Sequence, residues 1–311
     1  MKRSYDRYII SRKATDAQYE KFDALLDILT DLGKPAVAFS GGVDSTFLLR
    51  AARIASEDAR EGTASASRSG DALANSDAVS EPGDTPGEPV AITVDSDFVP
   101  AREGNEAADI CRCEGVPQIV LQVASEDIEG FSDNPPDRCY ICKKYMFTKI
   151  KEAAASEGCA SVIEGSNTDD AGDYRPGRRA LSELGIKSPM QEAGLSKEDI
   201  RALSKDMGLE TWNKPSFACL ASRFEYGQKI TEEKLRMVEA AEQSLFDMGL
   251  AQVRVRVHGL IARIEVPEED IEKLAGSGMR KEITERFRAL GFAYTALDLE
   301  GYRTGSMNEV L

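Results

Sequence analysis

Residues 40–46 read Ser-Gly-Gly-Val-Asp-Ser-Thr, and the segments on either side of them indicate how the chain folds here. The apolar run Pro-Ala-Val-Ala-Phe at 35–39 precedes this stretch, and Phe-Leu-Leu at 47–49 follows it. This order is typical of a strand, a tight loop and a helix start. Paired glycines let a backbone approach an oxyanion closely, and a helix N-terminus adds unpaired N–H groups and partial positive charge. The stretch therefore predicts a phosphate-binding loop.

The loop is not a Walker A loop, because no Gly-Lys-Ser/Thr follows at the required spacing and the turn contains no lysine. The pattern SGGxDS resembles instead the PP-loop of ATP pyrophosphatases, which bind ATP, adenylate a substrate oxygen and release pyrophosphate. An ordinary glycine turn capped by Ser or Asp is the competing interpretation. Seven matching positions behind a strand favour the nucleotide site, with Asp44 as the Mg²⁺ ligand. The residues expected to hold ATP are Ser40, Gly41, Gly42, Asp44, Ser45 and Thr46.

Strand-like and helix-like segments alternate through the first two thirds of the chain. A helix is expected at 16–32, strands at 35–39, 90–94, 118–121 and 161–165, and further helices at 100–115 and 142–158. Such alternation predicts right-handed βαβ units and a parallel sheet that binds ligands at the carboxyl ends of its strands. The predicted fold is therefore α/β, with a PP-loop ATP pyrophosphatase domain over residues 1–225.

Two other regions differ from this pattern. Residues 56–88 contain mostly Ala, Ser, Gly, Asp, Glu and Pro, so we expect a disordered surface insertion whose removal from 58 to 87 leaves activity and stability unchanged. From residue 226 to 311 we expect a smaller α+β domain that serves the substrate or oligomerisation. Its expected helices are 231–248 and 268–290, and its expected strands are 253–258, 262–266 and 293–299.

Net charge, apolar content and cysteine number limit the classes of protein to which this chain can belong. The 311 residues have a net charge of −15, which argues against a large polyanion such as nucleic acid as the partner and leaves small anionic ligands open. No uncharged apolar stretch reaches the ~18 residues of a membrane span. We expect a soluble, cytoplasmic protein whose six cysteines do not form a disulfide framework.

Three of these cysteines are placed for chemistry. Cys139 and Cys142 form a C-x₂-C pair after a Pro- and Asp-rich loop, and Cys219 lies in another loop-like run. Two thiolates at this spacing and a distant third could hold an iron–sulfur cluster with one iron lacking a protein ligand. A structural zinc site would need a fourth ligand such as Cys159, and simple buried or idle thiols are a third reading. The residues alone leave these three interpretations equally weighted.

Charged residues suggest two further sites. Acids between 164 and 173, beside a strand end, could hold Mg²⁺, although a solvated loop is the better explanation of acids alone. In the run 253–258, alternation places Arg254, Arg256 and His258 on one face and three valines on the other. Two such arginines suit one phosphate, and the wet face of a half-buried strand is the equally weighted alternative.

Several motifs in order resemble the LarE family of ATP-dependent sulfur transferases, which act in nickel-pincer cofactor biosynthesis. They are the PP-loop, DYRPGRRA at 173–180, WNKPSFACLASRFEYG at 212–227, VRVRVH, ARIEVP and LDLEGYRTGSMN. The resemblance covers nearly all of the chain outside the insertion and the first dozen residues. It implies adenylation, with MgATP, of a carboxylate of pyridinium-3,5-biscarboxylic acid mononucleotide, then sulfur insertion to give a thiocarboxylate.

The resemblance also implies roles for particular residues. Sulfur comes in this family either from one sacrificed cysteine or from a [4Fe–4S] cluster on three cysteines, and Cys139, Cys142 and Cys219 resemble the three-cysteine version. The resemblance further implies substrate contacts for Arg254 and Arg256, positions beside the sulfur loop for Ser222 and Arg223, and a metal near Asp298. A homo-oligomer, such as a hexameric ring, is implied as well.

Three other functions remain as alternatives. A PP-loop thiolase acting on tRNA could also use a three-cysteine cluster, but the acidic charge disfavours it. An amidotransferase-like PP-loop ligase would need ammonia and no cysteine triad. A nucleotide-binding or cluster-carrying regulator would bind ATP without releasing pyrophosphate.

Overall fold

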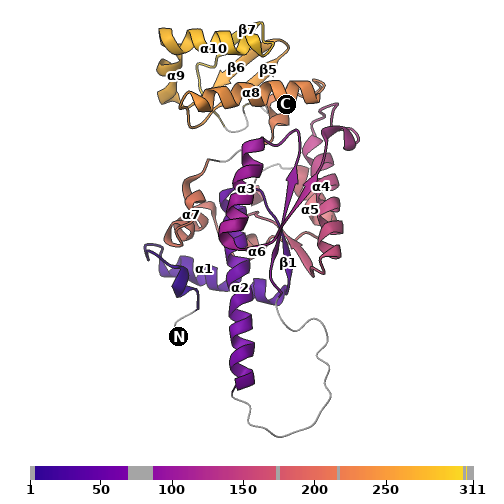
Figure 1. Ribbon diagram of the computed structural model, residues 1–311, viewed down its shortest axis with the longest axis vertical. Coiled ribbons are helices and arrows are strands. Elements are labelled where there is room, and N and C mark those ends of the chain that lie inside the picture. Colours follow the sequence, from indigo (N-terminus) through magenta and orange to yellow (C-terminus); the bar gives the residue numbers. More distant parts are fainter. Residues whose placement is uncertain (1–3, 69–86, 173–175, 216–217, 304–305, 307–311) are drawn as a thin grey trace. The chain divides into compact units, whose positions relative to one another are not determined.

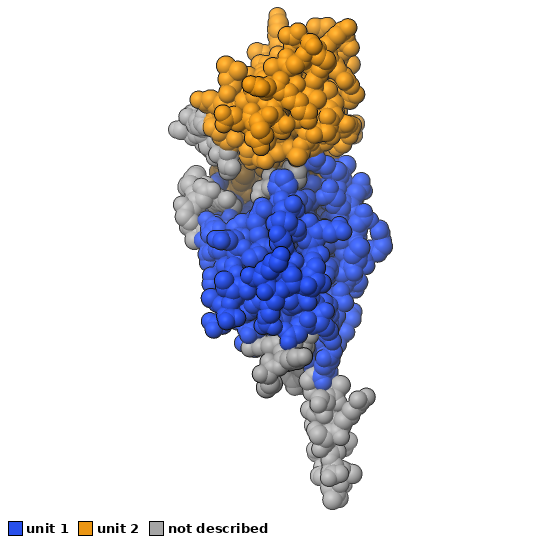
Figure 2. All heavy atoms as spheres, turned by 90° about the vertical axis from the view of Figure 1, so that its left-hand side faces the viewer, with its two compact units in different colours: residues 1–95, 101–122, 143–216 blue, residues 96–100, 123–142, 217–311 orange. Residues whose placement is uncertain are grey.

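The structure is a computed structural model that describes residues 4–68, 87–172, 176–215, 218–303 and 306. It divides into two compact units, which Figure 2 colours blue and orange. Unit 1 comprises residues 1–95, 101–122 and 143–216, and unit 2 comprises residues 96–100, 123–142 and 217–311. No helix among the described residues has the length and apolar character needed to cross a bilayer.

Unit 1 is built on a four-stranded, wholly parallel sheet with the strand order β3-β2-β1-β4. Its strands are β1 (Pro35–Ala38), β2 (Val90–Asp95), β3 (Gln118–Gln122) and β4 (Ser161–Ile163). Residues 36–38 of β1 pair with 90–92 of β2, and residues 35–37 pair with 161–163 of β4. The central position of β1 explains its continuous apolar sequence, because both of its faces are covered. The predicted α/β class with a parallel sheet is confirmed.

Helices cover both faces of this sheet (Figure 1). Val37, Ala91 and Ile163 point into a core with α1 (Asp16–Asp31), α2 (Val43–Arg68), α3 (Ala101–Glu114) and α7 (Lys197–Asp206). The neighbouring residues Ala36, Ile92 and Val162 point to the other face, where α4 (Arg138–Ser156) and α5 (Pro176–Glu183) pack. This alternation fixes the register of the sheet, since a slip of one residue would exchange the two faces.

Short elements occur in both units. No helix was predicted from the sequence between 168 and 223, where α5, α7 and several short elements lie. The short helix α6 follows α5, and the remaining segments are 3-10 turns. Their bounds are η1 (Ser4–Tyr8), η2 (Ser125–Asp127), η3 (Thr168–Gly172), α6 (Pro189–Glu192), η4 (Glu210–Asn213) and η5 (Leu220–Arg223).

Unit 2 contains a three-stranded mixed sheet in the order β5-β6-β7. The strands β5 (Arg254–His258) and β6 (Ile261–Glu265) are antiparallel, and β7 (Tyr294–Leu297) runs parallel to β6. The helices of this unit are α8 (Glu232–Asp247), α9 (Glu268–Ala275) and α10 (Ser277–Ala289). The expected single helix over 268–290 is wrong, because the chain is extended at Gly276, which has ψ 147°.

The second unit draws in segments from before residue 226. The backbone N–H of Leu220 donates to the carbonyl of Phe98, and that of Gly227 donates to the carbonyl of Asn134, both at 2.9 Å. Ile230 N–H donates to Ser132 at 2.8 Å. These bonds explain why 96–100 and 123–142 group with 217–311, so that one boundary at residue 226 does not describe the compact units.

The expected disordered insertion over 56–88 is wrong for its first part. Helix α2 continues through 56–68, and Glu57 in this part accepts hydrogen bonds from Arg7 and Arg53, both at 2.8 Å. These contacts of Glu57 with basic side chains stabilise a part of the helix that has few apolar residues to bury. Residues 69–86 of the expected insertion lie outside the described residues.

Candidate functional site

The PP-loop joins β1 to the N-terminus of α2 in unit 1. Gly41 has φ +69°, and a Cβ there would lie 3.2 Å from the Cα of Ala107 on α3, so this position favours glycine for both backbone angle and space. Within the loop, the Ser45 hydroxyl donates to the carbonyl of Gly42 at 3.2 Å. The amides of the first turn of α2 have no acceptor within the helix by geometry, so the loop suits an anion such as phosphate.

Asp44 lies in the first turn of α2 and is held from two sides. Its Oδ2 is 2.5 Å from Nζ of Lys197, and its Oδ1 accepts a long hydrogen bond of 3.5 Å from Nδ2 of Asn167. Asn167 follows β4, and Lys197 is the first residue of α7. The carboxylate expected to hold Mg²⁺ is thus paired with a lysine that the sequence analysis did not single out.

A second lysine contacts the same loop. Lys214 Nζ donates to the carbonyl oxygen of Gly41 at 3.0 Å and forms an ion pair of 2.5 Å with Glu106 on α3. Lys197 and Lys214 supply the cations that the loop itself lacks. No pattern in the sequence pointed to them, because each reaches the loop from more than 150 residues away along the chain.

The acids beside β4 serve mainly to shape the loop there. Asp170 accepts from the backbone N–H of Asn167 at 3.0 Å, and Asp169 accepts from the backbone N–H of Lys197 at 2.9 Å. Buried Glu164 accepts from the hydroxyls of Ser166 and Ser188. Part of the DYRPGRRA motif, residues 173–175, lies outside the described residues.

Unit 2 contains all three cysteines that the sequence analysis grouped together. Cys139 and Cys142 are one turn apart at the start of α4, and Cys219 precedes η5. Cys142 is buried, Cys139 is exposed and Cys219 is intermediate. The three thiols therefore belong to one compact unit, although Cys219 lies 77 positions after Cys142 in the sequence.

Arg138 and Asn134 connect the two cysteine segments. The buried Arg138 guanidinium donates to Asn134 Oδ1 and to the carbonyl of Ala221, the latter at 3.0 Å. Asn134 Nδ2 donates to the carbonyl of Glu225 at 2.7 Å. Asn134 has φ +53°, a left-handed conformation that asparagine tolerates better than most residues. Sequence analysis missed this pair, since a buried polar contact leaves no periodic signal.

Tyr226 lies within electrostatic reach of both cysteine segments. Burial raises the pKa of its phenol; the charge of Arg138 acts against this rise, and the charges of Cys139 and Cys219 add to it. Arg138 lies 5.7 Å from the centre of the Tyr226 ring. Three thiols of one unit match the number and kind of donors that a three-cysteine cluster needs. In the described part of the chain, no three His, Cys, Asp or Glu side chains are grouped around a single ion position.

Two buried ion pairs lie beside the Cys219 segment. Arg223 contacts Glu242 through two hydrogen bonds of 2.8 and 3.0 Å, and Arg256 contacts Glu265 at 2.8 and 3.0 Å. Arg223 also donates to the carbonyl of Cys219 at 3.1 Å and to the Ser222 hydroxyl at 2.7 Å. The Arg223–Glu242 pair attaches α8 to the segment that follows Cys219, and Arg256 attaches β5 to it by donating to the carbonyl of Ser222 at 3.0 Å.

The basic face of β5 is buried, which corrects the expected half-buried strand. Arg254 is 2% exposed and Arg256 is 5% exposed, because Glu265 and the ring of Tyr302 cover this face. Burial, together with the charge of Arg223, lowers the pKa of Arg254 to about 10. Asp298 lies 3.2 Å from Arg263 and 3.6 Å from Arg303, so it is an arginine partner in this structure.

The other three cysteines belong to unit 1, not to the unit that contains Cys139, Cys142 and Cys219. Cys111 and Cys113 are on α3, and burial, with a contribution from the charge of Glu114, raises the pKa of Cys111 to about 12. Burial also raises the pKa of Cys159. Raised pKa values keep these two thiols protonated at neutral pH and hence poorly reactive.

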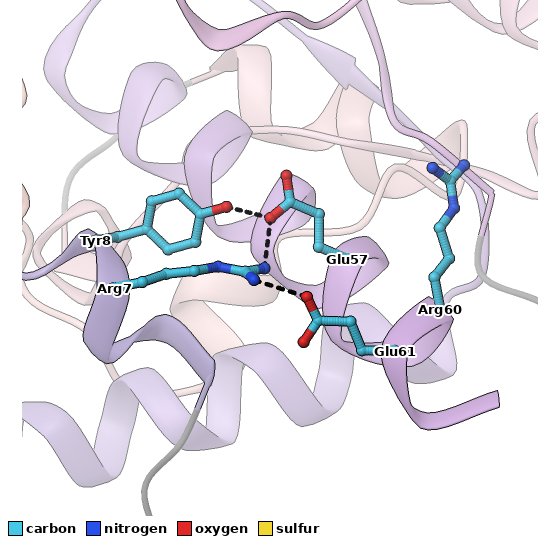
Figure 3. Close-up of a pocket in the computed structure, with 5 residues that line it drawn as sticks. All are labelled: Arg7, Tyr8, Glu57, Arg60 and Glu61. Carbon is cyan, nitrogen blue, oxygen red and sulfur yellow. Dashed lines mark hydrogen bonds and ion pairs between the residues drawn. The ribbon is translucent and has the colours of Figure 1, made fainter. Parts of the chain in front are cut away.

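A pocket on unit 1 is lined by residues of η1 and of the outer half of α2 (Figure 3). Arg7, Tyr8, Glu57, Arg60 and Glu61 line it, and Arg7 pairs with Glu61 at 2.6 Å. Its ion pairs attach η1 to the outer half of α2. The pocket contains no residue of the PP-loop and none of the three grouped cysteines.

The sequence of this chain is similar to those of several known proteins. No family model matches the chain. It is 35% identical over 289 residues to the pyridinium-3,5-bisthiocarboxylic acid mononucleotide synthase of Lactiplantibacillus plantarum, covering 92% of this chain and 93% of the relative. It is also 35% identical to an uncharacterised protein of Synechocystis, covering 94% and 98% of the two chains. A third relative, from Methanocaldococcus jannaschii, is 33% identical over 57% of this chain and 68% of its own length.

Proposed function

The chain belongs to the LarE family, and from this premise we propose that it is an ATP-dependent sulfur transferase that converts a carboxylate into a thiocarboxylate. The proposed substrate is pyridinium-3,5-biscarboxylic acid mononucleotide, because the relative from L. plantarum is named for the synthesis of the bisthiocarboxylic acid. The observation that carries the proposal is an identity that extends over both compact units.

The first half-reaction is assigned to unit 1. A carboxylate oxygen of the substrate forms a bond to the α-phosphorus of ATP, and the bond from this phosphorus to the bridging oxygen breaks, releasing pyrophosphate. The amides at the start of α2 would hold the phosphates, and the hydroxyls of Ser40, Ser45 and Thr46 would contribute further donors. Asp44 would hold Mg²⁺, which when bound neutralises charge on the phosphates.

The second half-reaction is assigned to unit 2. Sulfur forms a bond to the activated carboxyl carbon, and the bond from that carbon to the AMP oxygen breaks, releasing AMP. Cys139, Cys142 and Cys219 would hold a [4Fe–4S] cluster, which when bound would supply a transferable sulfide. Arg256 and Arg254 would bind the substrate phosphate, which requires Glu265 and Tyr302 to uncover them first. The family resemblance further supports a homo-oligomer and a cytoplasmic location.

Reconstitution tests the overall reaction. The purified protein, MgATP and pyridinium-3,5-biscarboxylic acid mononucleotide are incubated under anaerobic conditions, and the products are analysed by mass spectrometry. We expect pyrophosphate release that requires the substrate, and a mass gain of about 16 Da for each oxygen replaced by sulfur. Stable tRNA binding with tRNA thiolation, and no change in the mononucleotide, would contradict the proposal.

The variant Asp44→Asn tests the metal assignment. It keeps the size of the side chain and removes the charge, so we expect ATP–pyrophosphate exchange to fall about 100-fold with little change in melting temperature. Normal exchange in this variant would exclude Asp44 as the metal ligand.

Iron and acid-labile sulfide analysis of anaerobically purified protein tests the source of sulfur. Equal amounts of iron and sulfide, close to four of each per chain, are expected for the cluster. Iron-free protein in which Cys219 alone loses the mass of H₂S after one turnover would instead support the sacrificed cysteine. Zinc near one equivalent per chain would indicate a structural zinc site.

A further inference from the structure

Asp44 is the acid assigned to Mg²⁺, yet both of its oxygens already have partners within the protein. Lys197 Nζ lies 2.5 Å from Oδ2, and Asn167 Nδ2 lies 3.5 Å from Oδ1. A divalent metal and the Lys197 ammonium would compete for the same oxygen, because both are cations that need direct contact with it. Direct contact of a metal with Oδ2 therefore requires Lys197 to leave this oxygen.

The ion pair between Lys197 and Asp44 can open easily. The two side chains are 26% and 27% exposed, and a pair this accessible to water contributes little to the stability of a protein. The backbone of Lys197 is held separately, since its N–H donates to Asp169 at 2.9 Å. The side chain can therefore turn away from Asp44 without the start of α7 moving.

A triphosphate at the PP-loop would attract the released ammonium. Its charge exceeds that of one carboxylate, and Lys197 already reaches the first turn of the helix whose N-terminus the phosphates would occupy. Lys214 is anchored differently, by Glu106 and by the carbonyl of Gly41, and the structure gives it no contact with Asp44 among the described residues.

We propose that Lys197 occupies Asp44 as an internal cation until the triphosphate of ATP draws it away, so that the divalent metal joins Asp44 only together with the nucleotide. The inference rests on the proposed function of Asp44 as the metal ligand. The inference adds an order of binding. Metal alone binds poorly to the nucleotide-free protein, and ATP frees Asp44 for the metal. By thermodynamic linkage, the metal then tightens the binding of the triphosphate.

Titration with Mn²⁺ alone, followed by electron paramagnetic resonance in the absence of nucleotide, tests the competition. Lys197→Met removes the competing cation, so it should bind Mn²⁺ about five-fold tighter than the parent protein. Lys197→Arg keeps a cation, and Lys214→Met removes a loop lysine that does not contact Asp44. Both should bind Mn²⁺ as the parent does. Unchanged or weaker Mn²⁺ binding by Lys197→Met would overturn the proposal.

Nucleotide titration tests where Lys197 goes. Calorimetry with α,β-methylene-ATP in EDTA should give weaker binding for Lys197→Met than for the parent, while AMP, which lacks the outer phosphates, should bind equally to both. An equal loss for AMP and for the analogue would contradict the transfer of Lys197 to the triphosphate. Circular dichroism checks that each variant is folded, and Lys197→Gln replaces Lys197→Met if the latter is not.

One further variant separates this inference from its premise. If Asp44→Asn leaves the Mg²⁺ dependence of analogue binding unchanged, Asp44 does not hold the metal, and both the assignment and the inference are wrong. If Asp44→Asn removes that dependence and Lys197→Met does not tighten Mn²⁺ binding, only the inference is wrong. A loss of dependence in Asp44→Asn with tighter Mn²⁺ binding in Lys197→Met supports both.

Discussion

Gly165 positions the PP-loop by having no side chain. A Cβ at this position would lie 3.2 Å from the Cβ of Asp44 and 3.3 Å from the backbone nitrogen of Ser45, closer than side chains normally pack. The chain after β4 can therefore approach the start of α2 only with glycine at this point. Close approach also brings Asn167 within reach of Asp44.

The variant Gly165→Ala should consequently impair the nucleotide site more than the fold. The added methyl group pushes Asp44 by a few tenths of an ångström, so we expect a loss of about 1–3 kcal/mol in stability and a clear fall in ATP–pyrophosphate exchange. Thermal melting and exchange assays measure the two effects. Gly104→Ala, on α3 with open space around its position, is the matched control and should keep full exchange. Equal exchange in both variants would show that the close approach does not matter.

At single residues, the sequence was informative where a motif is local and uninformative where a contact is distant. The positions of Gly41 and Asp44 at a helix start could be predicted, because strand, loop and helix follow within a dozen residues. Lys197 and Arg138 could not, because their partners lie far away along the chain. Polar contacts of this kind form between residues that only the folded chain brings together, so a single sequence gives no local pattern for them.

Helix α7 is held to the N-terminal segment by two acids with lowered pKa values. Burial alone would raise the pKa of Asp199, but hydrogen bonds from Lys21, the Ser196 backbone and Gln18 outweigh it and lower the pKa to about 2. Asp206 has a lowered pKa too, since hydrogen bonds from the Ala14 backbone and from other donors near the N-terminus outweigh its burial. Both carboxylates must be charged to make these contacts.

Acid should therefore weaken unit 1 at this helix. A carboxyl whose pKa is lower in the folded state stabilises the protein above its unfolded pKa of 3.8, and this stabilisation is lost as pH falls toward about 2. For Asp199 the loss amounts to about 2 kcal/mol. Urea unfolding of the parent and of Asp199→Asn between pH 6 and pH 2 measures it. We expect the parent to be more stable at pH 6 and the difference to shrink below pH 4; a constant difference would contradict the assignment.

The sequence pattern predicted the strands and missed several helices. The seven strands among the described residues fall within a few residues of their expected positions, because each is a short apolar or alternating run, although only some of these strands are buried. Helix α7 was missed although its Ile200 and Leu203 are fully buried, because most of its ten residues are charged or polar and carboxylates make further contacts with the N-terminal segment. The outer end of α2 was missed because its contacts are ion pairs, in which Glu57 and Glu61 attach it to Arg7.

This outcome narrows the expected dispensable segment to residues 69–86. Replacing them with a Gly/Ser sequence of equal length should leave the melting temperature and the sulfur-transfer rate close to those of the parent, since their composition offers little apolar surface to bury. Replacing 58–87 should cost more, because it also removes the pairs Arg7–Glu61 and Arg60–Glu88. Each exposed pair contributes at most about 1 kcal/mol. A large loss from the shorter replacement would show that this segment folds or binds a ligand.

At the scale of the whole molecule, the proposed half-reactions divide between the two compact units. Unit 1 contains the PP-loop, Lys197 and Lys214, and unit 2 contains the three grouped cysteines and the buried arginines. Sequence spacing indicated the PP-loop, the three cysteines and the arginines but not the two lysines, and it drew the boundary at residue 226. The hydrogen bonds of Asn134 and Arg138 explain the difference, because they join the C-x₂-C segment to residues after Cys219.

Mutations in the two units should therefore separate the two half-reactions. Adenylation needs the nucleotide loop and its metal, whereas transfer needs sulfur within attacking distance of the activated carbon. Changing Cys139, Cys142 or Cys219 to Ala should abolish thiocarboxylate formation and any brown chromophore, while ATP–pyrophosphate exchange stays within about two-fold of the parent. Cys111→Ala, Cys113→Ala and Cys159→Ala in unit 1 are the controls and should retain both activities. Loss of exchange in a folded Cys219 variant would mean that the unit 2 cysteines also act in adenylation, and the assignment of one half-reaction to each unit would fail.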